Sequence, residues 1–202
     1  MIAIVDYGVG NLASIRNMFV KVGAEARVTS DPGEIAGAER LVLPGVGAFD
    51  HAMENLETSG LIPALRAAAL DDRRPVLAIC LGMQLLTRGS EEGDRRGLCW
   101  FDADTVSLRP PDPAAKVPHM GWNRVEAAPG SPLLAGIDDP QFYFLHSFHV
   151  RCADEADVAG SCTYAGVRFT AAMRRDNLWA AQFHPEKSHR FGMQLFRNFV
   201  GA

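Results

Sequence analysis

The chain has 202 residues, of which 48% are hydrophobic and 22% charged, and its formal net charge is -4. This length and apolar content are typical of one compact domain, so we expect a single domain over residues 1–202. A slightly acidic chain without basic runs lacks the charge that binds nucleic acid or anionic membranes, and neither is an expected partner. The apolar start ends at Asp6, which is too early for a signal-peptide core or a membrane span and favours a cytoplasmic location.

The first half of the sequence alternates short apolar runs with amphipathic periodicity. The short runs predict strands at residues 2–5, 26–29, 41–43 and 76–79. The periodic segments predict helices at residues 12–22, 52–56 and 61–70. Such alternation favours an α/β fold with an open, mostly parallel sheet covered by helices on both faces.

A glycine-bearing loop follows the first predicted strand. Gly8 and Gly10 have the spacing that opens the dinucleotide-binding fingerprint G-x-G-x-x-G. Ala13 takes the place of the third glycine, and only Asp31 offers an acidic residue at the end of the second predicted strand. A dinucleotide site therefore stays open as an alternative at this point of the chain.

The second half has a different character, with short strand-like runs separated by proline, glycine and aspartate. These runs lie at residues 105–108, 122–125, 142–145, 172–173 and 178–183. We expect them to extend the sheet with antiparallel strands. Apolar residues recur at helical spacing from Phe191 to Phe199, which predicts a final helix docked on the sheet.

An apolar run that ends in a cysteine is the feature around which the chemistry is predicted. Cys80 follows the strand at residues 76–79 and precedes the helix-forming run that starts at Leu81. A thiol there would lie at the carboxyl end of a strand, where open sheets bind ligands, and at a helix N-terminus, which favours the thiolate. Gly82 permits a tight turn, and the Leu81 N–H is available to hold an oxyanion. The alternative is a buried cysteine that serves as a small hydrophobic side chain.

The other three cysteines are Cys99, Cys152 and Cys162. No C-x-x-C pair and no metal-ligand spacing occurs among the four, so they predict free thiols in a reducing compartment. We interpret Cys99, Cys152 and Cys162 as packing residues.

The strand at residues 41–43 leads into the loop Pro44-Gly45-Val46-Gly47. Glycine on both sides of Val46 allows the intervening peptides to rotate, so this loop can aim an N–H at a substrate oxygen. If Gly45 adopts a positive φ, the Gly45–Val46 peptide has two accessible orientations, and a partner could select the productive one. An ordinary strand-to-helix turn is the alternative.

A histidine and a carboxylate lie two residues apart, around a proline that fixes the local backbone, in His184-Pro185-Glu186. His184 can take a proton from Cys80 and return it to a leaving amine, while Glu186 orients the imidazole and stabilises its charged form. The predicted catalytic set is therefore Cys80, His184 and Glu186. The competing bases are interpreted as packing or surface histidines: His51, His119, His146, His149 and His189.

Taken together, these segments resemble a known family, the class I glutamine amidotransferases. The nucleophile turn, oxyanion loop and His-x-Glu element of that family match Cys80-Leu81-Gly82-Met83-Gln84, Pro44-Gly45-Val46-Gly47 and His184-Pro185-Glu186. Two more segments, Asp6-Tyr7-Gly8 and His119-Met120-Gly121-Trp122-Asn123, resemble one branch of the family, which supplies ammonia to imidazole glycerol phosphate synthase. The resemblance covers residues 2–200.

The resemblance implies chemistry on glutamine. Cys80 would attack the side-chain amide carbon, N–H groups near Val46 and Leu81 would hold the oxyanion, and ammonia would leave with a proton from His184. It further implies that the glutamine pocket is lined by Gly47, Gln84, Ser147 and Phe148. No metal and no cofactor are expected.

The resemblance also implies a partner that consumes the ammonia, the (β/α)8-barrel cyclase subunit of imidazole glycerol phosphate synthase. Trp122 and Lys187 are predicted to face this partner, because the tryptophan lies in a polar segment and the lysine directly follows the catalytic acid. A core position is the alternative for Trp122. Three rival functions stay open: an amidotransferase subunit for another acceptor, a stand-alone γ-glutamyl hydrolase, and a non-enzymatic interaction protein.

Overall fold

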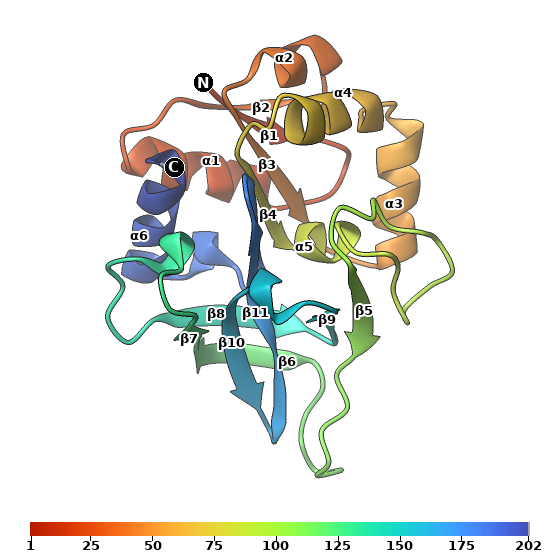
Figure 1. The fold of residues 1–202 in the computed structure, drawn as a ribbon, viewed down its shortest axis with the longest axis vertical. Coiled ribbons are helices and arrows are strands. Elements are labelled where there is room, and N and C mark those ends of the chain that lie inside the picture. Colours follow the sequence, from red (N-terminus) through yellow and green to blue (C-terminus); the bar gives the residue numbers. More distant parts are fainter. Residues whose placement is uncertain (202) are drawn as a thin grey trace.

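One large mixed β-sheet runs through the molecule, and helices cover both of its faces (Figure 1). The computed structural model describes residues 1–201. Five neighbouring strands make up the parallel half of this sheet. In spatial order they are β2 (Ala26–Thr29), β1 (Ile2–Val5), β3 (Arg40–Gly45), β4 (Val76–Cys80) and β12 (Leu178–Ala181).

The side chains of β1 alternate between two apolar clusters, one on each face of the sheet. Ile2 and Ile4 pack with residues of α1 (Leu12–Lys21) and α6 (His189–Val200). The opposite face is covered by α2 (Pro32–Gly37), α3 (Phe49–Thr58) and α4 (Ile62–Arg66). Burial on both faces explains why the parallel strands are almost continuous apolar runs.

Antiparallel strands extend the sheet beyond β12. They are β5 (Ala103–Ser107), β7 (Glu126–Ala127), β9 (Phe148–Cys152), β10 (Val158–Tyr164) and β11 (Val167–Arg175). β11 pairs with β12, β10 and β9, while β9 also pairs with β5. The predicted α/β fold with antiparallel additions is therefore confirmed.

Two strands of the second half do not join the large sheet. β6 (His119–Arg124) and β8 (Gln141–His146) pair with each other as a separate antiparallel ribbon. An isolated bridge between Tyr143 and His184 connects this ribbon to the segment after β12. The expectation that these strands extend the large sheet was wrong, and the ribbon lies across its lower end in Figure 1.

The remaining elements are single turns. They are α5 (Leu81–Leu85), the π-helical turn Ala67–Asp71 and the 3-10 turns Pro132–Leu134, Glu155–Asp157 and Pro185–Lys187. Among residues 1–201, no helix is long and apolar enough to cross a membrane.

Asp31 has a local structural role. Its carboxylate accepts hydrogen bonds from the backbone N–H groups of Gly33 and Glu34 and so caps α2. This capping explains the acidic residue that had kept the dinucleotide alternative open. The helix itself, which is only six residues long, was not predicted.

Candidate active site

The ends of β4 and β12 bring the predicted nucleophile and base together. The two strands are parallel neighbours, with Ile79 opposite Ala181. Because parallel strands end at the same edge, the residues that follow them also meet, and Gln182 Nε2 donates to Cys80 Sγ at 3.9 Å. Two residues further on, His184 lines the same cavity as Cys80 and is close enough for the thiol to influence its pKa.

Cys80 occupies a strained turn. Its φ of 55° and ψ of −112° are rare for a residue with a side chain, and such strain is found where the surrounding structure holds a functional group in place. Gly82 is required by close packing, since a Cβ there would lie 2.0 Å from the Leu43 carbonyl oxygen. α5 follows as predicted but is only five residues long. Its dipole is therefore weaker than that of a full helix.

His184 is fixed from several directions. Its backbone N–H donates to the Tyr143 carbonyl at 2.8 Å, and its Nδ1 lies 2.9 Å from Glu186 Oε1. Ser188 Oγ donates to the His184 carbonyl at 2.6 Å and accepts from the Tyr143 N–H. With Nδ1 held by the carboxylate, Nε2 is the ring nitrogen left for Cys80. The structure thus places Cys80, His184 and Glu186 in the predicted order.

The electrostatics of His184 favour its charged form. Burial alone would lower its pKa, but hydrogen bonds to Cys80 and Glu186, together with their negative charges, raise the pKa of His184 well above its usual range. The Glu186 side chain is only 1% exposed, so its charge acts on His184 with little screening by solvent. An imidazolium beside the thiol stabilises the thiolate, which is the nucleophilic form of cysteine.

The Pro44-Gly45-Val46-Gly47 loop packs tightly on the nucleophile turn. Pro44 and Gly45 continue β3, and Gly45 lies opposite Cys80 in the register. Gly45 does not adopt the positive φ on which the two-orientation hypothesis depended. A Cβ on Gly45 would lie 2.7 Å from the Gly82 nitrogen. Gly47 is the residue in the left-handed region, with φ of +99°. The loop therefore needs Gly45 for close approach and Gly47 for its turn.

A cavity of about 290 Å³ opens above the thiol, and this size suits a small molecule. Among the predicted site residues, all but Glu186 and Trp122 line it: Val46, Gly47, Cys80, Leu81, Gln84, Ser147, Phe148, His184 and Lys187. Glu186 is bonded to His184 Nδ1, and Trp122 is on the outer surface.

Gln84 connects the pocket wall to the thiol through side chains. Its Nε2 donates to the Phe148 carbonyl at 3.1 Å and to Gln182 Oε1 at 3.1 Å, and Gln182 Nε2 faces Cys80 Sγ. Both amide hydrogens of Gln84 are therefore used within the protein. Its Oε1 is the atom through which it can contact a substrate.

Sequence reasoning missed Glu92 as a pocket residue. Its Oε2 accepts from the Phe49 N–H at 2.8 Å, which attaches the carboxylate to the segment just after the Gly47 turn. The adjacent acids Glu91 and Glu92 are a visible signal in the sequence. Nothing in their spacing indicates that a loop following α5 folds back to the oxyanion loop.

His146 was interpreted as a packing or surface residue, yet it also lines the pocket. It is 5% exposed and lies near the carboxyl end of β8. Its Nδ1 is 2.9 Å from the Phe148 carbonyl. Only the folded position of the β6–β8 ribbon, which the sequence did not predict, brings this ring to the site.

The outer face of the β6–β8 ribbon is apolar and exposed. Met120 lies opposite Leu145 and Trp122 opposite Tyr143 in the register, and Met120, Trp122 and Leu145 are 66%, 45% and 38% exposed. Lys187 Nζ lies 5.8 Å from the centre of the Tyr143 ring. A core position for Trp122 is thus ruled out. We call Met120, Trp122, Tyr143, Leu145 and Lys187 the outer face.

The other cysteines differ from Cys80. Burial raises the pKa of Cys152 to about 11 and that of Cys162 to about 12, which suits unreactive packing thiols. Cys99 is exposed, so its interpretation as a packing residue was wrong. It lies in an irregular segment and has φ of 57°, a geometry that composition does not reveal. No cluster of three or more metal-ligating side chains occurs among the residues that the structure describes.

Three features define a class of protein: a strained cysteine at a strand end, a His–Glu pair in the segment after the neighbouring strand, and an open α/β sheet. The chain belongs to the family "Glutamine amidotransferase class-I", whose model matches residues 3–202. Within that class it is similar to "Imidazole glycerol phosphate synthase subunit HisH 2" of Pseudomonas aeruginosa, with 50% identity over 99% of this chain and 98% of that protein. The protein of the same name from Methanococcus maripaludis is 46% identical over the same shares of the two chains.

Solved structures show the same fold at lower identity. A glutamine amidotransferase is similar with a TM-score of 0.75 and 15% identity, and the match covers 99% of both chains. PurLQS from Thermotoga maritima is similar with a TM-score of 0.73 and 15% identity, over 99% of this chain and 97% of that one. At this identity the likeness establishes the shared fold and not a shared acceptor substrate.

Proposed function

We propose that this chain is the glutaminase subunit of an imidazole glycerol phosphate synthase, and that it passes ammonia to a cyclase partner. The observation that carries the glutaminase activity is the placement of Cys80 and His184 in one small-molecule cavity, with Glu186 bonded to His184 Nδ1. Support for the pathway comes from the relatives named as HisH subunits, which match nearly the whole chain.

The first half of the reaction forms a thioester. The Cys80 thiolate attacks the amide carbon of the glutamine side chain, and the carbonyl oxygen becomes an oxyanion that the Val46 and Leu81 N–H groups hold. Collapse of this intermediate breaks the C–N bond. The proton on His184 Nε2 goes to the leaving nitrogen, so ammonia departs and a γ-glutamyl thioester remains.

The second half regenerates the enzyme. His184, now neutral, removes a proton from water, and the resulting hydroxide attacks the thioester carbonyl. When the C–S bond breaks, glutamate is released and Cys80 returns as a thiolate. His184 keeps the proton taken from water, and Glu186 at 2.9 Å from Nδ1 stabilises the imidazolium in both halves.

Two side chains are suited to the amino acid end of glutamine. Glu92 supplies a carboxylate in the cavity, which can pair with the substrate α-ammonium group. Gln84 can accept from the same ammonium through Oε1, because its Nε2 hydrogens are already used. Gly47, Ser147 and Phe148 complete the wall of the pocket. This arrangement places the amide end of glutamine toward Cys80.

The outer face is the proposed contact with the cyclase. Tryptophan and methionine are enriched at protein interfaces, and both are exposed on this face as Trp122 and Met120. The face adjoins the cavity, because Leu145 and Lys187 belong to both. A partner bound there would cover the mouth of the site and receive ammonia directly, which a stand-alone γ-glutamyl hydrolase does not require.

All four cysteines are free thiols, and we therefore infer a cytoplasmic, reducing location.

The test is a reconstitution with the purified chain and the cyclase subunit. Glutamate release should rise at least about tenfold when cyclase and its phosphoribulosyl substrate are both present, with imidazole glycerol phosphate as the product. An anthranilate synthase subunit in place of the cyclase is the control and should give no stimulation. Equal glutamate release by the chain alone, or stimulation by the control subunit only, would overturn the proposed function.

A further inference from the structure

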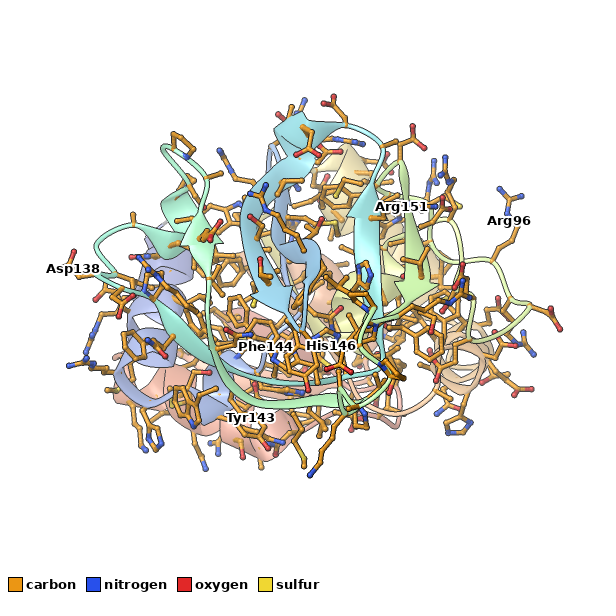
Figure 2. All side chains as sticks on the ribbon, turned by 90° about the horizontal axis from the view of Figure 1, so that it is seen from below. Arg96, Asp138, Tyr143, Phe144, His146 and Arg151 are labelled. Atoms are coloured by element: carbon orange, nitrogen blue, oxygen red, sulfur yellow. The ribbon has the colours of Figure 1, made fainter. Side chains whose placement is uncertain are left out.

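Two buried histidines that the reaction does not use lie between the β6–β8 ribbon and the glutamine pocket. His119 is 2% exposed and lies at the start of β6, while His146 is 5% exposed and lies at the end of β8. Figure 2 shows Phe144 and His146 on the interior side of β8, with Tyr143 on the opposite side. His119 is stacked between Phe144 and Tyr164, at ring-centre distances of 4.8 and 4.0 Å.

Hydrogen bonds connect these rings in series. Asn123 Nδ2 lies 3.3 Å from His119 Nε2, His119 Nδ1 lies 3.0 Å from His146 Nε2, and His146 Nδ1 lies 2.9 Å from the Phe148 carbonyl oxygen. That oxygen also accepts from Gln84 Nε2. The series therefore runs without a gap from Asn123 to the pocket residue Gln84.

The chemistry of the last acceptor fixes the direction of every bond. A carbonyl oxygen only accepts, so the proton of neutral His146 must be on Nδ1, and its Nε2 must accept. His119 must then donate from Nδ1, which leaves its Nε2 to accept from the Asn123 amide. The other hydrogen of that amide goes to the Thr163 carbonyl at 3.0 Å, and the Asn123 oxygen accepts from the Arg124 N–H.

We propose that His119 and His146 are positioning residues, both neutral with the proton on Nδ1, whose directed hydrogen-bond chain holds the Phe148 carbonyl in place for Gln84. This inference rests on the proposed glutaminase function for its effect, but not for its geometry. Both lone pairs of the Phe148 oxygen are occupied, one by His146 and one by Gln84. The Phe148 carbonyl thus fixes the Gln84 amide, which in turn bonds Gln182 beside the thiol.

The surroundings keep both rings neutral. Burial lowers the pKa of His119 to about 4, and burial lowers that of His146 to about 3 despite its bond to the Phe148 carbonyl. A second proton on His146, at Nε2, would face the His119 Nδ1 donor across the 3.0 Å contact. A second proton on His119, at Nε2, would face the Asn123 Nδ2 donor at 3.3 Å. The hydrogen-bond series thus requires His119 and His146 to be neutral, and the burial of the two rings keeps them so.

The protonation pattern can be measured without any activity. In protein labelled with ¹⁵N at histidine, two-bond ¹H–¹⁵N spectra at neutral pH report which ring nitrogen carries the proton. We expect His119 and His146 to be protonated on Nδ1, with resonances assigned from the His119→Asn and His146→Asn variants. A proton on Nε2 of either ring would overturn the proposed direction of the hydrogen bonds, whatever the protein catalyses.

A matched pair of variants tests the positioning role. His119→Asn keeps an N–H near the place of Nδ1 and can still donate to His146, whereas His119→Gln keeps an acceptor for Asn123 and lacks that donor. Both lose the stacked ring, so their melting temperatures should fall alike. We expect His119→Gln to raise the KM for glutamine about tenfold more than His119→Asn, with similar kcat, because a misplaced Gln84 weakens substrate binding uniformly.

The outcomes separate the two proposals. Equal KM values for the pair at equal stability would show that His119 has only a structural role. If the Nδ1 protons are observed but neither the wild type nor the variants release glutamate with any partner, the proposed function fails. The proposed hydrogen-bond series would then still be correct. A control that keeps both buried rings, His189→Asn on the exposed side of Trp122, should leave the His119 and His146 resonances unchanged.

Discussion

At the residue scale the proposed chemistry depends on the neighbours of His184. His184 has Cys80 on one side and Glu186 on the other, so its two ring nitrogens have separate tasks. His184→Ala should lower kcat for glutamate release by about 10⁴-fold or more, because both the acid and the base are lost. Glu186→Gln should be at least about tenfold less damaging, since the imidazole remains.

The pH profile gives these variants a second readout. Glu186 contributes to the raised pKa of His184, so its removal must lower that pKa. The imidazolium then loses its proton at lower pH, and the alkaline limb of kcat should move toward lower pH in Glu186→Gln. An alkaline limb at the wild-type position would mean that Glu186 does not act on His184.

At this scale the sequence predicted three side chains that the fold brings together. Cys80 ends β4, and His184 and Glu186 lie in the segment that follows the neighbouring strand β12. The ends of both strands can be read from apolar runs. Glu92 and His146 were missed because loops and a separate ribbon bring them to the pocket. No periodicity indicates such long-range contacts.

In the Pro44–Gly47 loop, the backbone conformation of Gly47 leads to a prediction about stability and activity. Gly47 and Gly23 both have a positive φ, +99° and +83°, and a Cβ would meet no atom within 4 Å at either position. Alanine at either should therefore cost about 1–2 kcal/mol of stability for the left-handed conformation alone. Only Gly47→Ala should also lower kcat/KM for glutamine, by about 10²-fold, because the misplaced loop loses an oxyanion donor.

Urea unfolding and steady-state kinetics of both variants provide the comparison. If Gly47→Ala kept wild-type kcat/KM while losing as much stability as Gly23→Ala, the loop would have no part in holding the oxyanion. The sequence correctly placed two glycines beside the site. It allowed a positive φ at Gly45 because it could not show that a Cβ there would lie 2.7 Å from the Gly82 nitrogen, which is a tertiary contact.

Elements with strong periodicity were predicted, and elements defined by pairing were not. β1, β2 and α1 agree with the expected ranges to within a residue because their apolar patterns are regular. β9 and β10 were missed, since apolar and polar residues do not alternate cleanly along either strand. The β6–β8 ribbon was expected in the large sheet because local sequence does not specify which strands pair.

At the scale of the whole molecule, the outer face is the surface proposed to bind the cyclase. Trp122 stacks on His189 at a ring-centre distance of 5.5 Å but is 45% exposed, so it contributes little to the core. Trp122→Ala should weaken association with the cyclase by at least about 2 kcal/mol, as expected of an interface hot spot, at nearly unchanged melting temperature. Calorimetric titration measures the affinity. Unfolding of the isolated variant, or wild-type affinity, would remove Trp122 from the interface.

The buried histidines predict how the stability of the whole molecule depends on pH. The pKa of His119 is about 4 when folded, below its ordinary value of 6.5, so the unfolded chain binds more protons between these values. The free energy of unfolding should therefore decrease as the pH falls through this window, by about 2 kcal/mol for this residue between pH 7 and pH 5.

Urea unfolding at the two pH values checks this linkage. His119→Asn should reduce the acid-induced loss of stability by about that amount, while His51→Asn on the surface should leave it unchanged. The same dependence in His119→Asn as in the wild type would show that His119 does not titrate between its ordinary pKa and the lowered one.

The central claim is a division of labour, in which Cys80 releases ammonia and the partner consumes it. The most direct measurement is imidazole glycerol phosphate formation by the complex of Cys80→Ser with the cyclase, supplied either with glutamine or with ammonium ions. Glutamine-dependent synthesis should fall by about 10⁴-fold or more, because only the ammonia source is lost, while ammonium-supported synthesis should stay within about twofold of wild type. Equal loss of both activities in a folded, still associated variant would contradict the account.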